Sequence, residues 1–138
     1  MNRLLALDIG TKRIGVAVSD PLRMFSTGLP TINRKPENKA IEIIKAVCDE
    51  YNVEKIIVGL PINMNGSSGQ QVEDVKEFVI LLESEISAEI IFQDERLTSI
   101  LAKRILIEQN ISPSKNKGLV DKKAAALILQ QYLDFINK

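Results

Sequence analysis

The chain has 138 residues, of which 45% are hydrophobic, so we expect a single domain with its own core over residues 1–138. Its formal net charge is zero, and it has one cysteine and no histidine. This excludes an intrachain disulfide, a Ser-His-Asp triad and an imidazole general base, and it argues against a zinc site.

The first segment predicts three strands. Residues 4–7 and 14–18 are short apolar runs, and Gly10-Thr11-Lys12 lies between them with the length of a hairpin connection. A third extended segment is expected within residues 24–32, where Pro30 limits it. The chain therefore opens with antiparallel strands.

Helices and strands alternate in the remainder. In chain order we first expect a helix opened by Pro36, a strand at 55–60, a loop at 63–69, a helix at 72–82 and a strand at 90–92. A helix from Thr98 or Ser99 to about Gln109 follows, then a mobile loop at 112–120 and a last helix from near Asp121 to Ile136. No apolar run approaches the ~20 residues of a membrane helix. No signal-peptide pattern follows Met1, so we expect a cytoplasmic protein without a membrane partner.

This order predicts an α/β protein. Three of the strands are apolar throughout instead of alternating, which is typical of strands covered by helices on both faces. The antiparallel start followed by helical crossovers to parallel strands predicts a mixed sheet.

Acidic residues follow two of these strands. Asp8 ends the first, and Asp94-Glu95 ends the strand at 90–92. Because ligands bind beyond the carboxyl ends of strands in open α/β sheets, these acids could meet and bind a hard cation such as Mg²⁺ or Mn²⁺. Adjacent strand residues point to opposite faces, so only one of Asp94 and Glu95 can face such a site, and spacing alone leaves the choice open. Asp121 has the position of a helix N-cap, and the three alanines that follow at 124–126 would let that helix approach the sheet.

Four segments resemble one family, in the same order and over nearly the whole chain. They are residues 8–17, residues 58–61 with Asn63 and Gly66, residues 94–99 and residues 121–130. The family is the YqgF type, whose members are called Holliday-junction resolvases and, more recently, pre-16S ribosomal RNA nucleases. The resemblance implies a ribonuclease-H-like fold, a mixed five-stranded sheet with helices on both faces.

The resemblance also implies a catalytic metal site. Asp8, Glu95 and Asp121 match the acidic metal-binding residues of the family, which selects Glu95 over Asp94. Two ions, Mg²⁺ or Mn²⁺, would activate water for phosphodiester hydrolysis. The identity of the ion stays open.

Five basic residues are candidates for contact with substrate phosphates. Lys12, Arg13 and Arg96 are close in sequence to the three acids, and Lys115 and Lys117 lie in the expected loop before Asp121. Solvated surface charge is the alternative interpretation of each.

The function that we expect is processing of the 5′ end of precursor 16S ribosomal RNA in ribosome biogenesis. Three alternatives stay open: a Holliday-junction resolvase acting on branched DNA, a non-catalytic module that binds RNA or the ribosome, and a sugar-kinase-like or actin-like ATPase, which would need a second domain. The expected partners are nucleic acid and ribosomal particles, and the chain would act as a monomer or homodimer.

Overall fold

The computed structural model describes residues 2–61, 69–95 and 98–138. Its elements are β1 (Arg3–Ile9), β2 (Arg13–Ser19), β3 (Ser26–Asn33), α1 (Glu37–Tyr51), β4 (Val53–Leu60), α2 (Gln70–Glu83), β5 (Glu89–Asp94), α3 (Thr98–Glu108) and α4 (Lys117–Ile136). The loop expected at 63–69 lies almost entirely outside the described residues.

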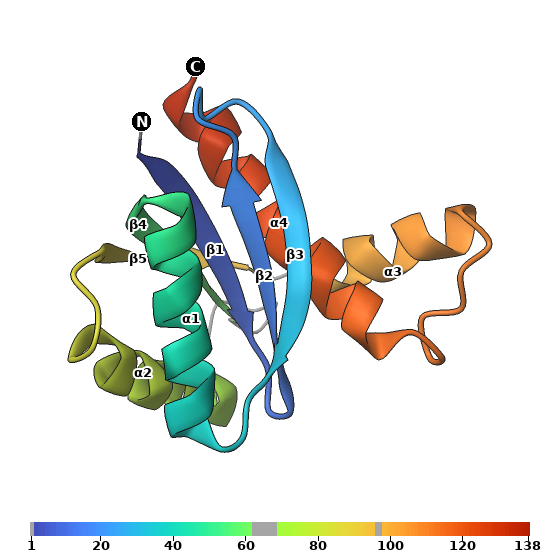
Figure 1. Cartoon of the computed structure of the whole chain (residues 1–138). Helices are drawn as coiled ribbons and strands as arrows, with labels where there is room; N and C mark the ends of the chain where they lie inside the picture. The colour runs from blue at the N-terminus through green and yellow to red at the C-terminus, as the bar shows by residue number, and fades with distance from the viewer. Residues whose placement is uncertain (1, 62–68, 96–97) are drawn as a thin grey trace.

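The strands form one mixed sheet in the order β3-β2-β1-β4-β5. β1 pairs antiparallel with β2, and β2 antiparallel with β3. β4 pairs parallel with both β1 and β5. The predicted hairpin start and parallel crossovers are confirmed, and the carboxyl ends of β1, β4 and β5 lie at one edge of the sheet (Figure 1).

Different helices cover the two faces of the sheet (Figure 1). In β1, Leu5 and Leu7 belong to the core beneath α1 and α2, whereas Leu4 and Ala6 belong to the core beneath α4. Successive residues of a strand point to opposite faces, so a strand covered on both sides is apolar at every position. Asp8 continues the alternation of Leu4 and Ala6 and therefore faces α4.

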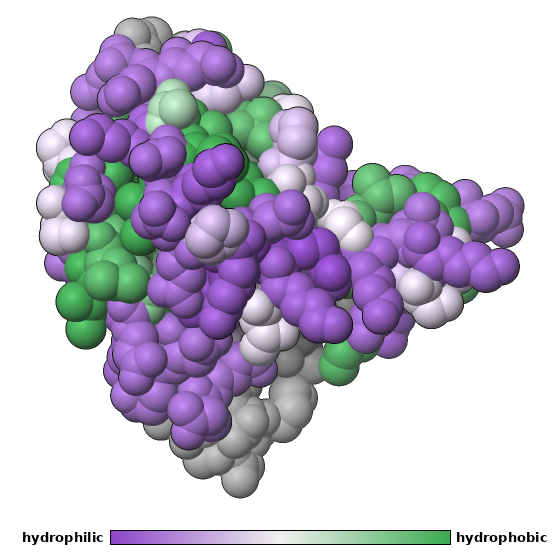
Figure 2. Space-filling view, turned by 60° about the horizontal axis from the view of Figure 1, so that its bottom comes forward, coloured by the Kyte–Doolittle hydropathy of each residue, from purple (hydrophilic) through white to green (hydrophobic). Residues whose placement is uncertain are grey.

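α3 and the first turns of α4, residues 98–124, form a projection that we call the α3–α4 arm (Figure 1). A small separate cluster holds it together: Ala102 and Leu106 of α3 pack against Val120 and Ala124 of α4. The arm stands away from the body of the molecule in the space-filling view as well (Figure 2).

Two sequence predictions need correction. α4 begins at Lys117, about one turn before Asp121, so residues 117–120 are helical and Asp121 lies inside the helix; Asn116 is the N-cap. Burial of Val120 and Ala124 against α3 stabilises this extra turn despite Gly118. β3 continues through Pro30 to Asn33, because β3 is an edge strand and its register shifts opposite the stretch Ile14–Val16.

Within the described ranges, none of the helices combines the length and the apolar character that crossing a membrane requires.

Candidate active site

The structure brings the three predicted acids into electrostatic contact. Asp8 lies near the end of β1, Glu95 directly follows β5, and Asp121 lies on α4. The backbone N–H of Glu95 donates to the carbonyl of Leu60 at 2.9 Å, which continues the pairing of β5 with β4. Burial raises the pKa of Asp8 from 3.8 to about 7, and the charges of Asp121 and Glu95 add to the rise. The three carboxylates therefore share one site on the α4 side of the sheet.

Close backbone packing fixes Asp121 beside Asp8. Gly15 of β2 pairs with Asp8 across the sheet, and a Cβ on Gly15 would lie 2.0 Å from the carbonyl oxygen of Asp121. Only glycine permits this approach. Of the alanines expected to allow it, Ala125 and Ala126 pack in the core beneath α4, and Ala124 packs within the arm. Sequence reasoning missed Gly15, whose lack of a side chain allows the contact with Asp121. Its signal was a small residue in the middle of an apolar strand.

Arg13 pairs with Asp121. Its Nε donates to Oδ2 of Asp121 at 2.7 Å, and the two side chains are 32% and 22% exposed. The structure thus places Arg13 at the acids, with its guanidinium directed at a carboxylate; its contact with substrate phosphates stays a prediction. The positive charge reduces the repulsion that Asp121 would otherwise exert on its acidic neighbours.

Two side chains orient Glu95. The amide of Gln93 donates to Oε1 at 2.5 Å, and the Thr98 hydroxyl donates to Oε2. Burial raises the pKa of Glu95, the two hydrogen bonds oppose that rise, and the charge of Asp94 adds to it. The sequence predicts Thr98 as a possible helix start within the segment 94–99, and no local pattern signals the contact of Gln93 with Glu95. Asp94 is exposed while Glu95 is half-buried, in agreement with the predicted opposite orientation.

The β1–β2 turn beside the acids is held by a buried arginine. Arg34 is 3% exposed and donates to both carboxylate oxygens of Asp74 on α2, at 2.9 and 3.1 Å. It also donates to the carbonyl of Gly10 at 2.8 Å. The guanidinium carbon Cζ of Arg34 lies over Phe78, 5.0 Å from the centre of the ring. The hydrogen bonds and charge of Arg34 lower the pKa of Asp74. No local pattern signals Arg34, because its partner lies in a distant helix.

The donor set fits a hard divalent cation. Carboxylate oxygens are the ligands that Mg²⁺ and Mn²⁺ prefer. Burial is the main cause of the raised pKa of Asp8, and a cation would offset the carboxylate repulsion that adds to it. Across residues 2–61, 69–95 and 98–138, no three acidic, histidine or cysteine side chains are gathered closely enough in this arrangement to hold a metal ion. Arg13 instead holds the carboxylate of Asp121, and Gln93 and Thr98 hold the carboxylate of Glu95.

The other predicted basic residues differ in position. Lys12 is exposed at the β1–β2 turn, Lys115 is exposed before α4, and Lys117 is the exposed first residue of α4. Arg96 lies outside the described residues. Hydrophilic side chains cover much of the surface between the body and the arm (Figure 2).

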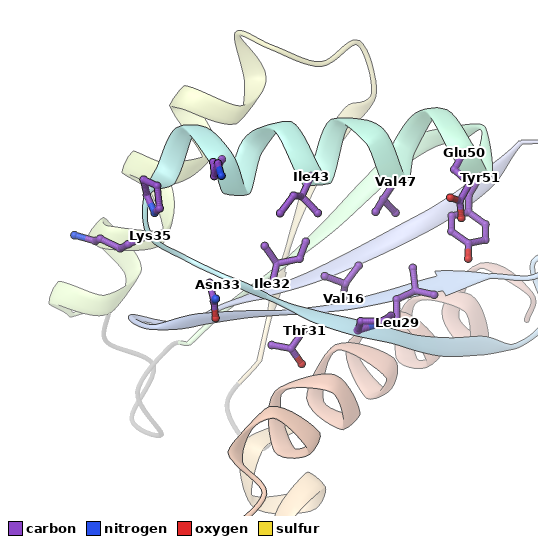
Figure 3. A pocket seen from close by; sticks show the side chains of 13 residues that line it. Val16, Leu29, Thr31, Ile32, Asn33, Lys35, Ile43, Val47, Glu50 and Tyr51 are labelled. Carbon is purple, nitrogen blue, oxygen red and sulfur yellow. The ribbon is translucent and has the colours of Figure 1, made fainter.

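One cavity of the protein lies away from the acids. This groove of about 520 Å³ runs between β3 and α1 (Figure 3). Val16 and Ile32 form part of its wall and belong to the core beneath α1, on the opposite face from Asp8. None of the three acids lines it, so it is not part of the candidate active site.

Comparison with known proteins gives one family. The family described as "RuvX: Holliday junction resolvase" matches residues 2–135. A Clostridium kluyveri protein named "Putative pre-16S rRNA nuclease" is 51% identical over 136 residues, which cover 99% of each chain. A Clostridium botulinum protein with the same name is 49% identical over 136 residues, with the same coverage.

Solved structures give the fold. RuvC from T. thermophilus, in complex with a Holliday junction substrate, matches with a TM-score of 0.55 at 12% identity, over 99% of this chain and 96% of that one. The Fowlpox virus resolvase, in complex with substrate Holliday junction DNA, matches with a TM-score of 0.60 at 12% identity, over 99% of each chain. The predicted ribonuclease-H-like fold is confirmed.

Proposed function

This chain belongs to the RuvX family, also called YqgF, and from that premise we propose that it is a divalent-metal-dependent nuclease that processes precursor 16S ribosomal RNA. Its relatives from the two Clostridium species, which match nearly end to end, carry the corresponding name. The substrate is the 5′ end of the precursor, and ribosomal particles are the setting in which the enzyme meets it.

One observation supports the proposal above all others. Asp8, Glu95 and Asp121, which come from three distant parts of the sequence, meet at the carboxyl edge of the sheet with the pKa of Asp8 raised to about 7 by burial and by the two neighbouring carboxylates. A group of like charges at a strand edge is costly for the fold. Its chemical use is to bind cations.

In the proposed mechanism Asp8, Glu95 and Asp121 would hold the metal, which we expect to be two Mg²⁺ or Mn²⁺ ions. Bound divalent ions supply activation of water and stabilisation of charge on the leaving oxygen. Gln93 and Thr98 orient Glu95. Arg13 offsets the charge of Asp121 in the metal-free site, and with metal bound there it would be available to contact the substrate backbone. Lys12 extends the positive charge from the β1–β2 turn toward phosphate groups.

A second candidate function is cleavage of four-way DNA junctions. The description of the family favours it, and the fold is shared with two resolvases that were solved with junction DNA. Symmetric cleavage of a junction would require a homodimer, whereas trimming an RNA end can be done by a monomer.

The decisive experiment compares the two substrates directly. A precursor fragment of 16S ribosomal RNA and a four-way DNA junction are incubated with the protein in Mg²⁺, in Mn²⁺ and in EDTA. We expect metal-dependent cleavage of the RNA and its loss in Asp8→Asn, with Asp94→Asn as the matched control that keeps activity. Cleavage of the junction alone would support the second candidate. Tight RNA binding without cleavage, unaffected by metal, would indicate a binding module and refute the nuclease.

A further inference from the structure

A cavity in the α3–α4 arm adjoins the acidic site. It has a volume of about 580 Å³, and its wall includes both Asp121 and Arg13. Lys103 of α3 and Lys117 of α4 also line it, together with Pro113 and Val120. The cavity therefore shares a wall with the proposed metal site while most of its lining comes from the arm.

The lining favours an anion. Three of the lining residues, Arg13, Lys103 and Lys117, are cationic, and Asp121 is already paired with Arg13. Lys117 begins the 20-residue helix α4, which has no side-chain cap at Asn116 and no acidic residue in its first turn. The positive end of the helix dipole therefore adds to the charge of the lysines.

The cavity also has an apolar side. Val120 is 8% exposed and packs in the core of the arm, and Pro113, in the segment before α4, also lines the cavity. Binding sites for small molecules typically have volumes of about 300–1,000 Å³ and combine apolar walls with a few polar groups. A phosphate joined to a sugar and a base matches this combination of charge, wall and size.

We propose that this cavity binds one nucleotide of the substrate strand next to the scissile phosphate, with Lys103 and Lys117 on its phosphate group. The proposal rests on the proposed nuclease function. It gives the arm a role, because the described residues of α3 pack only in the arm's own cluster and in neither core of the sheet. It also separates Lys117, which lines the cavity, from Lys115, which does not.

The test measures binding separately from cleavage. Affinity for a short fluorescein-labelled single-stranded RNA is measured by fluorescence anisotropy in EDTA over a series of salt concentrations, for wild type, Lys103→Ala and the double variant Lys103→Ala/Lys117→Ala. We expect the double variant to bind about tenfold more weakly. The slope of log affinity against log salt should fall by ~0.7 for each lost phosphate contact. In Mn²⁺, KM for cleavage should rise while kcat changes little.

Arg104→Ala is the matched control. Arg104 follows Lys103 on the same exposed helix and carries the same charge, but it does not line the cavity. Lys103→Arg should restore most of the lost affinity. If wild type cleaves RNA but the double variant keeps wild-type affinity and salt slope, or if Arg104→Ala weakens binding equally, the nucleotide pocket is refuted and the nuclease stands. If wild type neither binds nor cleaves RNA or junction DNA, both proposals fail together.

Discussion

Replacing Asp8 by asparagine should stabilise the metal-free protein at neutral pH. The pKa of Asp8 is raised from 3.8 to about 7 in the folded state, so folding favours its protonated form. Its contribution to stability is complete below pH 3.8, is lost progressively as pH rises toward 7, and stays lost above that. Each pKa unit corresponds to about 1.4 kcal/mol, so the full loss is about 4 kcal/mol. The amide of the Asp8→Asn variant has the same shape and does not titrate.

The assay is urea unfolding of both proteins in EDTA at a series of pH values. The difference in the free energy of unfolding should widen in favour of Asp8→Asn from about pH 4 to pH 7 and then remain constant at up to about 4 kcal/mol. Excess Mn²⁺ should stabilise wild type more than the variant, because binding to the folded state adds stability. A difference that does not change with pH, or a wild type that is the more stable protein in EDTA at neutral pH, would refute the reasoning.

Asp20→Asn provides a control of opposite sign. Hydrogen bonds from the backbone N–H groups of Phe25 and Met24 lower the pKa of Asp20. A carboxyl whose pKa is lowered by folding stabilises the protein at pH values above its pKa in the unfolded chain, and this stabilisation is lost as the pH falls. The Asp20→Asn variant should therefore be less stable than wild type at neutral pH and approach its stability in acid.

Three further predictions concern the same site. Glu95→Gln should nearly abolish RNA cleavage while Asp94→Asn retains most of it; the reverse result would mean that the wrong carboxylate faces the site. Gly15→Ala should lower the free energy of unfolding in urea by about 1–3 kcal/mol and weaken Mn²⁺ binding, because the new Cβ would lie 2.0 Å from the Asp121 carbonyl oxygen. A variant as stable as wild type would contradict that close contact. Arg13→Gln should tighten Mn²⁺ binding several-fold in titration calorimetry, since the ion no longer competes with a cation for Asp121; weaker binding would instead assign Arg13 to positioning Asp121.

The sequence by itself determined the layers of this protein. The unbroken apolar runs at residues 4–7 of β1 and 56–58 of β4 require cover on both faces of the sheet, and the helical spacing of the segments between the strands supplies that cover. The short connection after Ile9 permits only an antiparallel hairpin, while the longer crossovers permit parallel pairing. These are local properties, and the order of the elements then leaves few possible sheets.

The tertiary structure decided which side chains meet. Residue spacing could not choose between Asp94 and Glu95, and only the family resemblance favoured Glu95; in the structure Glu95 lies beside Gly59 and Ile128, on the face that α4 covers. The start of α4 at Lys117 depends on packing against α3, which outweighs the weak helical preference of the segment around Gly118. The ion pairs of Arg13 with Asp121 and of Arg34 with Asp74, and the cavity that brings Lys103 beside Asp121, join residues far apart in the chain. Such contacts are set by strand register and helix packing, which no local stretch of sequence encodes.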